Sequence, residues 1–269
     1  GNTMINLSDY QAFFSDIDGT LLDRKSKLHE RTINAMRQLP MPLYLISGRS
    51  EKAMRGIQKE LGAEDTLITL NGNAIMQNGK LLYQGPSLEG DILDEVLDRV
   101  FSLYADKVSI NAYDPFFWYA NNISDPHTIY EITVVGFAPD ILFSSKDQLR
   151  ARKLSKLMFI GEIEILAEIK KRLKGIQGIE AVYTHPDFLE VLPIGSNKRT
   201  GILKAAELLS IDLKKSIGAG DTEVDVPFLD EVGLPLLMGN SKEEIRKENY
   251  TLLDTNENDG LAKFIEENL

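Results

Sequence analysis

The sequence predicts an α/β protein with a Rossmann-like core, in which helices cover both faces of a parallel sheet, plus an inserted α+β domain. Three observations predict this. Short apolar runs alternate with amphipathic runs near both ends of the chain. The apolar runs lack strict alternation, as expected for strands that are buried on both faces. Between these two blocks, turn signals such as Asn78-Gly79 separate short strand-like segments, which is typical of antiparallel pairs.

The elements follow in order along the chain. In the first block we expect strands at 11–15, 43–46 and 67–70, helices at 30–39 and 51–61, and a hairpin of 74–77 with 80–83. In the middle block we expect helices at 91–104, 127–135 and 164–173, a strand at 154–160, and hairpins of 107–112 with 116–120 and of 180–184 with 188–192. In the last block we expect helices at 197–209, 223–229, 242–249 and 261–267, and strands at 216–219, 234–238 and 252–253. This order predicts a core domain built from 1–84 and 192–269, interrupted by an inserted domain at 85–191.

Composition narrows the class of protein. The chain has 269 residues, of which 43% are hydrophobic, enough for packed cores. Its net charge of −11 argues against a nucleic-acid binder, which needs a basic face. The chain has no cysteine, no apolar run near the ~20 residues that span a bilayer, and no signal peptide pattern at residues 1–4. We therefore expect a cytoplasmic protein with no nucleic-acid partner, no membrane partner and no evident obligate protein partner.

Polar residues follow the predicted core strands where ligands bind in open parallel sheets, beyond the carboxyl ends. Asp16 and Asp18 follow the first strand, and Ser47, Gly48 and Arg49 follow the second. Gly220-Asp221 follows a later strand, with Asp225 one helical turn further on. If these strands are neighbours, these three groups meet at one edge of the sheet.

The residue types at this edge suit phosphate chemistry. Carboxylates in one crevice repel one another, and a Mg²⁺ ion, which takes carboxylate, water and phosphate oxygens as ligands, would relieve that repulsion. Ser47 offers a hydroxyl group, Gly48 lets backbone N–H groups approach closely, and Lys198 starts a helix, where an anion is stabilised. Arg199 and Lys204 are alternatives to Lys198. One aspartate could attack phosphorus and a second could transfer protons.

The chain resembles the haloacid dehalogenase superfamily. Residues 16–20, Asp-Ile-Asp-Gly-Thr, match its DxDGT signature, 47–49 resemble its second motif, Lys198 its third, and Gly220-Asp221 with Asp225 its fourth. The resemblance implies that Asp16 is the nucleophile and Asp18 the general acid/base. It also implies that Asp16, the Asp18 carbonyl and Asp221 hold Mg²⁺ with support from Asp225, and that Ser47 and Lys198 bind phosphate. Arg49, in the second motif, is grouped with Ser47, Gly48 and Lys198 among the residues expected to bind phosphate or substrate, and its exact role is left open.

The insertion between the second and third motifs is similar to the C2-type cap of the Cof-type sugar-phosphate phosphatases. Short echoes of that subgroup stand at 70–72, 238–240 and 259–262. Two positions depart from the pattern, since Val224 stands where many relatives have Asn and Ser47 where Thr is commoner. Val224 puts the metal affinity or its supporting contacts in doubt.

The resemblance implies a Mg²⁺-dependent phosphatase that hydrolyses a small phosphorylated metabolite, plausibly a sugar phosphate, through an aspartyl-phosphate. Two alternatives remain: a phosphomutase similar to phosphomannomutases, and a catalytically weakened phosphate-binding regulatory protein. A dinucleotide-binding dehydrogenase is set aside because no G-x-G-x-x-G follows the first strand.

Other polar and aromatic residues are assigned to structure. The three histidines have no metal-like spacing and are expected at the surface or in packing. Trp118 is expected in the core of the inserted domain or on a hairpin face. We expect Asn240 to cap the helix predicted at 242–249.

Overall fold

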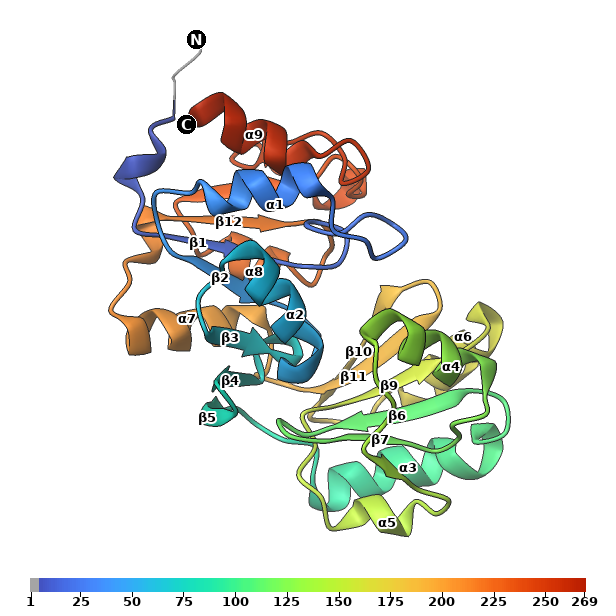
Figure 1. Ribbon diagram of the computed structural model, residues 1–269. Helices are drawn as coiled ribbons and strands as arrows, with labels where there is room; N and C mark the ends of the chain where they lie inside the picture. Colours follow the sequence, from blue (N-terminus) through green and yellow to red (C-terminus); the bar gives the residue numbers. More distant parts are fainter. Residues whose placement is uncertain (1–4) are drawn as a thin grey trace. The chain divides into compact units, whose positions relative to one another are not determined.

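The structure is a computed structural model that describes residues 5–269. The chain forms two compact units (Figure 1). One contains the residues up to Tyr83 together with Asn197–Leu269, and the other contains Gln84–Ser196. The expectation about a signal peptide concerns residues 1–4, which lie outside the described part of the chain. None of the helices in the described part is both long and apolar enough to cross a bilayer.

The first unit is built on an eight-stranded sheet in the order β14-β13-β12-β1-β2-β3-β4-β5. From β14 to β3 all neighbouring strands are parallel, and β4 is antiparallel to β3. The strands are β1 Ala12–Ser15, β2 Leu43–Ile46, β3 Thr66–Thr69, β4 Ala74–Gln77, β5 Lys80–Gln84, β12 Ser216–Gly220, β13 Leu234–Leu237 and β14 Thr251–Leu252.

Helices cover both faces of this sheet because successive strand side chains point to opposite faces. Phe13 of β1 packs in a core with α1 Glu30–Arg37, α2 Glu51–Leu61 and α9 Gly260–Asn268. Phe14 points the other way and packs with α7 Lys198–Leu209 and α8 Val226–Leu229. The predicted doubly covered parallel sheet is confirmed.

The strand order reverses next to β1, which lies between β2 and β12. The chain runs from β1 through β2 to β3 on one side, and from β12 through β13 to β14 on the other. In open α/β sheets, ligands bind at such a switch point, beyond the carboxyl ends of the strands. Residues that follow β1, β2 and β12 therefore define the place to look for a site.

The second unit is a six-stranded sheet in the order β10-β11-β9-β6-β7-β8. All its pairs are antiparallel except β7 with β8, in keeping with the predicted α+β character. The strands are β6 Ser109–Tyr113, β7 Trp118–Ala120, β8 Ile141–Leu142, β9 Lys156–Ile160, β10 Ile179–His185 and β11 Phe188–Pro193. Because β11 runs to Pro193, this unit ends later than the predicted boundary at residue 191.

One face of this second sheet packs against α3 Gly90–Tyr104, α5 Asp147–Arg150 and α6 Ile163–Leu173, which form an apolar core with it. Helix α4 Pro126–Val135 contacts the other face, where Thr128 bonds to Ser109. Trp118 is buried in this unit, and its indole N–H donates to Asn111 Oδ1 over 2.8 Å.

Three local predictions were wrong or incomplete. The helix predicted at 242–249 is only a single 3₁₀ turn, Glu243–Ile245, because this polar stretch buries no side chain in that turn. The helix predicted at 223–229 shortens to α8, which has Pro227 in its first turn and follows a turn over residues 222–225. Strand β8 and helix α5 were not predicted, since each is too short to show a period.

A buried ion pair lies within the second unit. Lys156 of β9 bonds to Glu190 of β11, and the two residues are 4% and 3% exposed. The Lys156 ammonium also lies 5.1 Å from the centre of the Tyr113 ring. Breaking such a pair is costly, because it takes the opposite charge away from a buried ion.

We predict that Lys156→Met lowers the free energy of unfolding by about 3–5 kcal/mol, because the buried Glu190 loses its ion-pair partner Lys156. The double variant Lys156→Met/Glu190→Leu should recover much of this loss. Lys146→Met is the matched control in the same unit, since Lys146 pairs with an Asp98 side chain that is 51% exposed; its expected effect is below ~1 kcal/mol. Urea unfolding measures all three, and equal losses for the two single variants would contradict the prediction.

Candidate active site

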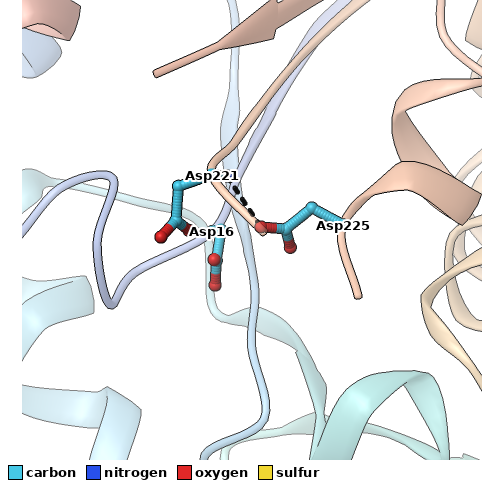
Figure 2. A group of neighbouring side chains, drawn as sticks. All are labelled: Asp16, Asp221 and Asp225. Carbon is cyan, nitrogen blue, oxygen red and sulfur yellow. Dashed lines mark hydrogen bonds between the residues drawn. The ribbon is translucent and has the colours of Figure 1, made fainter. Parts of the chain in front are cut away.

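Two aspartates lie side by side at the switch point of the core sheet. Asp16 directly follows β1, Asp221 directly follows β12, and these strands are parallel neighbours with Ser15 opposite Ala219. The Asp16 N–H continues the ladder by donating to Ala219 O over 2.9 Å. Figure 2 shows both side chains grouped with that of Asp225. Segments that are 205 residues apart in the chain are thus brought together by strand pairing (221 − 16).

Lys198 supplies the positive charge of this group. Its Nζ donates to Asp225 Oδ1 over 2.6 Å and to Asp16 Oδ1 over 3.1 Å, and the residue is 2% exposed. Lys198 is the first residue of α7, whose start is held by reciprocal bonds between Asn197 and Thr200. The capped helix start therefore aims this lysine at the carboxylates, and neither Arg199 nor Lys204 takes its place.

Asp225 positions both its neighbours. Its Oδ1 accepts from Lys198, and its Oδ2 accepts from the N–H groups of Asp221 and Thr222 over 2.8 and 3.2 Å. A Cβ at residue 220 would lie 2.6 Å from the Asp225 Cβ, so only glycine leaves room for this arrangement. Asp225 thus fixes the backbone that carries Asp221. It does so although this chain has Val224 at the position where many relatives have Asn.

The electrostatics of the group are strongly perturbed. Burial and the Asp225 carboxylate raise the pKa of Asp16 to about 7, although Lys198 acts in the opposite direction. Burial together with the Asp16 and Asp225 carboxylates holds the pKa of Asp221 well above its usual range. Burial also opposes the ionisation of Asp225, but Lys198 and the surrounding hydrogen bonds lower its pKa. Although burial disfavours the charge of Lys198, the two carboxylates raise its pKa.

This donor set fits a divalent cation. Asp16, Asp221 and Asp225 each offer a carboxylate oxygen, and these atoms lie within 4.8 Å of one another. One lysine does not balance three carboxylates, and burial together with the neighbouring carboxylates raises the pKa values of Asp16 and Asp221. Hard cations such as Mg²⁺ prefer oxygen ligands of this kind.

The loop after β1 wraps closely around Asp221. Gly19 has φ +78°, and a Cβ there would lie 1.9 Å from Asp221 Oδ2. Thr20 is buried and its hydroxyl donates to Asp221 Oδ1 over 3.3 Å. The Gly-Thr of the DxDGT pattern therefore has a steric and a hydrogen-bonding role against the second aspartate.

Asp18 differs from the other aspartates in its partner and exposure. Its side chain is 52% exposed, and its carboxylate accepts two bonds from Arg49, from Nε over 2.8 Å and from Nη2 over 2.7 Å. Asp18 is not part of the cluster formed by the Asp16, Asp221 and Asp225 carboxylates. Arg49, predicted as a phosphate ligand, thus contacts the predicted acid/base.

Ser47 and Gly48 follow β2, next to β1. Ser47 is buried, and its hydroxyl oxygen accepts from the Arg49 N–H over 3.0 Å. A Cβ at residue 48 would lie 2.8 Å from Asn71 Oδ1, so glycine lets Asn71 approach. The Asn71 N–H also donates to Ser47 O over 3.0 Å, which ties the turn after β3 to this loop.

Thr20 and Asn71 have contacts in the site that the motifs did not predict, although Thr20 belongs to the DxDGT pattern and Asn71 to the segment 70–72. The positive φ of Asn71, +59°, is the feature that an Asn-Gly pair signals. The expectation for Asn240 was wrong, because the helix that it would cap is absent. Asn240 instead donates from Nδ2 to Gly19 O over 3.0 Å and accepts from the Asn256 N–H over 3.1 Å.

The fold and the site together define a class of α/β enzymes. Its members have a cluster of carboxylates that can bind a cation at the switch point of the core sheet, and a second unit inserted in the chain. The family of haloacid dehalogenase-like hydrolases matches residues 13–265. The chain belongs to this family, and the predicted resemblance to haloacid dehalogenase-like phosphatases is confirmed.

Relatives of the chain are phosphatases by name. A "putative phosphatase" of Haemophilus influenzae is 28% identical over 263 residues, covering 96% of this chain and 98% of the relative. An "HMP-PP phosphatase" of Yersinia pestis is 30% identical over 264 residues, covering 95% of this chain and 94% of the relative. A haloacid dehalogenase-like hydrolase from Bacteroides thetaiotaomicron shares the fold with a TM-score of 0.81 at 23% identity, over 97% of this chain and 100% of that one.

We predict that Gly19→Ala weakens binding of a divalent cation, because the added methyl group displaces the Asp221 carboxylate. Gly79→Ala is the matched control: its φ is +80°, but nothing lies within 4 Å of the added Cβ. Both variants should lose about 1–2 kcal/mol of unfolding free energy from backbone strain. Only Gly19→Ala should also lose cation affinity, by about tenfold or more, in calorimetric titrations with Mg²⁺. Equal affinity in the two variants would contradict the steric argument.

Proposed function

We propose that this phosphatase hydrolyses the monoester of a small phosphorylated metabolite through an aspartyl-phosphate on Asp16, with Mg²⁺ as its cofactor. One observation carries the proposal: the Asp16 carboxylate is held at Oδ1 by Lys198 and by the Ile17 N–H, over 3.1 and 2.8 Å. A carboxylate fixed through one oxygen presents its other oxygen in a defined direction. That is what an attacking group requires.

Mg²⁺ would be held by Asp16 and Asp221, with Asp225 supporting the site through Lys198 and the Asp221 backbone. When bound, the cation supplies charge neutralisation to the phosphoryl oxygens and to the carboxylate that approaches them. The assignment rests on the oxygen-only donor set and on the presence of three carboxylates beside a single ammonium group. Asp18 would contribute through its main-chain carbonyl.

The chain's own residues account for two steps. In the first, Asp16 attacks phosphorus, the bond from phosphorus to the ester oxygen breaks, and Asp18 gives a proton to the leaving oxygen. In the second, Asp18 takes a proton from water, the water oxygen bonds to phosphorus, and the bond to Asp16 breaks to release phosphate. Arg49 holds the Asp18 carboxylate through two hydrogen bonds. These bonds must weaken when Asp18 gives or takes a proton in the reaction.

Ser47, the Gly48 N–H and Lys198 are assigned to the transferring phosphoryl group. A protein with a net charge of −11 needs such local groups to attract an anion. We assign selection of the leaving group to the unit at 84–196. Sugar phosphates and the HMP-PP of the relatives' name belong in a substrate screen.

The first test uses Asp16→Asn. Phosphate release from p-nitrophenyl phosphate and from the screened metabolites should depend on Mg²⁺ and fall by more than ~10³-fold in this variant. Asp9→Asn, an exposed aspartate of the same unit, should leave the rate unchanged. After acid quenching, label from a ³²P-substrate should remain on Asp18→Asn protein but not on Asp16→Asn.

Two outcomes would redirect the proposal. Label that returns to an isomerised sugar phosphate instead of free phosphate would indicate a phosphomutase. Bound phosphate analogue without any turnover would indicate the regulatory alternative. If the wild-type protein releases phosphate no faster than Asp16→Asn, and its rate does not depend on Mg²⁺, hydrolysis at this site is rejected.

The second test concerns pH. Because the pKa of Asp16 is raised to about 7, this carboxyl group carries a proton at lower pH that a cation must displace. The affinity for Mg²⁺ should therefore rise with pH up to about 7, and binding at pH 6 should release protons. Calorimetry in buffers of different ionisation enthalpy measures both quantities. A constant affinity between pH 5.5 and 8, with no proton release, would contradict it.

A further inference from the structure

We propose that His29, acting as an imidazolium, is a positioning residue that ties the loop after the nucleophile to the segment before α9. The loop spans residues 18–28 and carries Asp18 and Thr20. The segment spans residues 254–259. Neither the family match nor the motifs assign any role to this histidine.

The geometry requires a doubly protonated ring. His29 Nε2 lies 2.8 Å from Asp23 Oδ2, and Nδ1 lies 2.6 Å from Asp259 Oδ1. Carboxylates accept hydrogen bonds, and a neutral imidazole has only one N–H to donate. Both hydrogen bonds form together only when both ring nitrogens carry protons. His29 therefore links Asp23 to Asp259 only in its charged form.

The Asp23 carboxylate is held in place independently of His29, and the backbone of Asp259 is held by its N–H, which donates to Asn256 O over 3.3 Å. Asp23 Oδ1 accepts from the N–H groups of Lys25 and Lys27 over 2.8 and 3.0 Å, and its own N–H donates to Lys27 O over 2.9 Å. Asp259 immediately precedes α9, with φ +57°. His29 therefore bridges a preformed carboxylate on the loop and the carboxylate of the residue that precedes the last helix.

Other contacts join the same two segments. Asn256 Nδ2 donates to Leu22 O over 3.0 Å, and the Arg24 N–H donates to Glu257 Oε1 over 2.6 Å. Among these contacts, His29 is the group whose charge changes near neutral pH. The strength with which the loop is docked should thus depend on the protonation of one residue.

The charged neighbours are accounted for. Arg31 of α1 acts on Asp259 but is itself bonded to Glu266 of α9 over 2.8 Å. Lys263 of α9 is paired with Asp254 over 2.7 Å. On the loop, the guanidinium of Arg24 lies 4.0 Å from Glu257. Asp23 and Asp259 remain as the groups that contact the ring.

The direction of the pH dependence follows from these contacts. The hydrogen bonds to Asp259 and Asp23 raise the pKa of His29. A raised pKa means that the stabilisation is complete below the unfolded value of about 6.5 and is lost as pH rises through the folded value. Docking of the loop should weaken at alkaline pH.

For the reaction, this inference rests on the proposed function. The loop delivers Asp18 to the leaving group, so a loosened loop should lower kcat on the alkaline side more than it raises KM. The titration of His29 and the protection of loop amides are independent of any activity. They decide the inference even if phosphate release is never detected.

The experiment compares His29→Gln with the matched control His127→Gln. His127 also contacts a carboxylate, Asp125, over 3.0 Å, and its side chain is 31% exposed against 33% for His29. NMR titration of the three histidines, assigned with these variants, should show that His29 titrates above about 6.5. Hydrogen exchange then measures protection of the Asp23 and Arg24 amides from pH 6 to pH 9.

Protection of these two amides should fall about tenfold or more in His29→Gln, should fall in wild type as pH rises, and should be unchanged in His127→Gln. Asp259→Asn, which keeps the shape of the anchor, should lower the midpoint of His29 and reduce protection in the same direction. A His29 midpoint at or below 6.5, or equal protection in wild type and His29→Gln at pH 6, would overturn the inference.

Discussion

The buried ion pairs of Lys198 are the interaction on which the rest of the site depends. This one ammonium contacts Asp16 and Asp225, and Asp225 in turn holds the backbone of Asp221. Buried carboxylates without a partner would protonate or displace the surrounding chain. The three carboxylates can therefore stay close together only because the Lys198 ammonium, at the start of α7, lies beside them. The capping box of α7 holds that helix start in place.

Close backbone approach is the second constraint, and it explains why glycines punctuate the motifs. Gly19 leaves room for the Asp221 carboxylate, and Gly220 leaves room for Asp225. At Gly72, where φ is +88°, a Cβ would lie 2.1 Å from Asn197 O, so the turn after β3 packs directly on the start of α7. Gly19 and Gly72 thus mark places where segments distant in the sequence come into close contact, and Gly220 leaves room for Asp225 within its own turn.

The aspartates of the first motif have different surroundings despite lying two residues apart. Asp16 is buried against Lys198, whereas the Asp18 side chain is half exposed and held by Arg49. Burial raises the pKa of Asp16, and an acid in that state readily exchanges its proton for a cation. Distinct environments let two chemically identical groups take different parts in one reaction.

The sequence by itself determined the α/β class, the inserted unit and the candidates Asp16, Asp18, Ser47, Lys198 and Asp221, because apolar periodicity and short motifs are local signals. It also assigned a helix at 242–249 that does not form, since charge pattern alone does not show whether a segment finds a surface to pack on. Only the tertiary structure decided that Asn240 reaches Gly19, that Arg49 holds Asp18 and that His29 bridges Asp23 and Asp259. The physical reason is that these contacts join segments up to 230 residues apart, and strand order and helix packing, not local spacing, bring them within hydrogen-bonding distance.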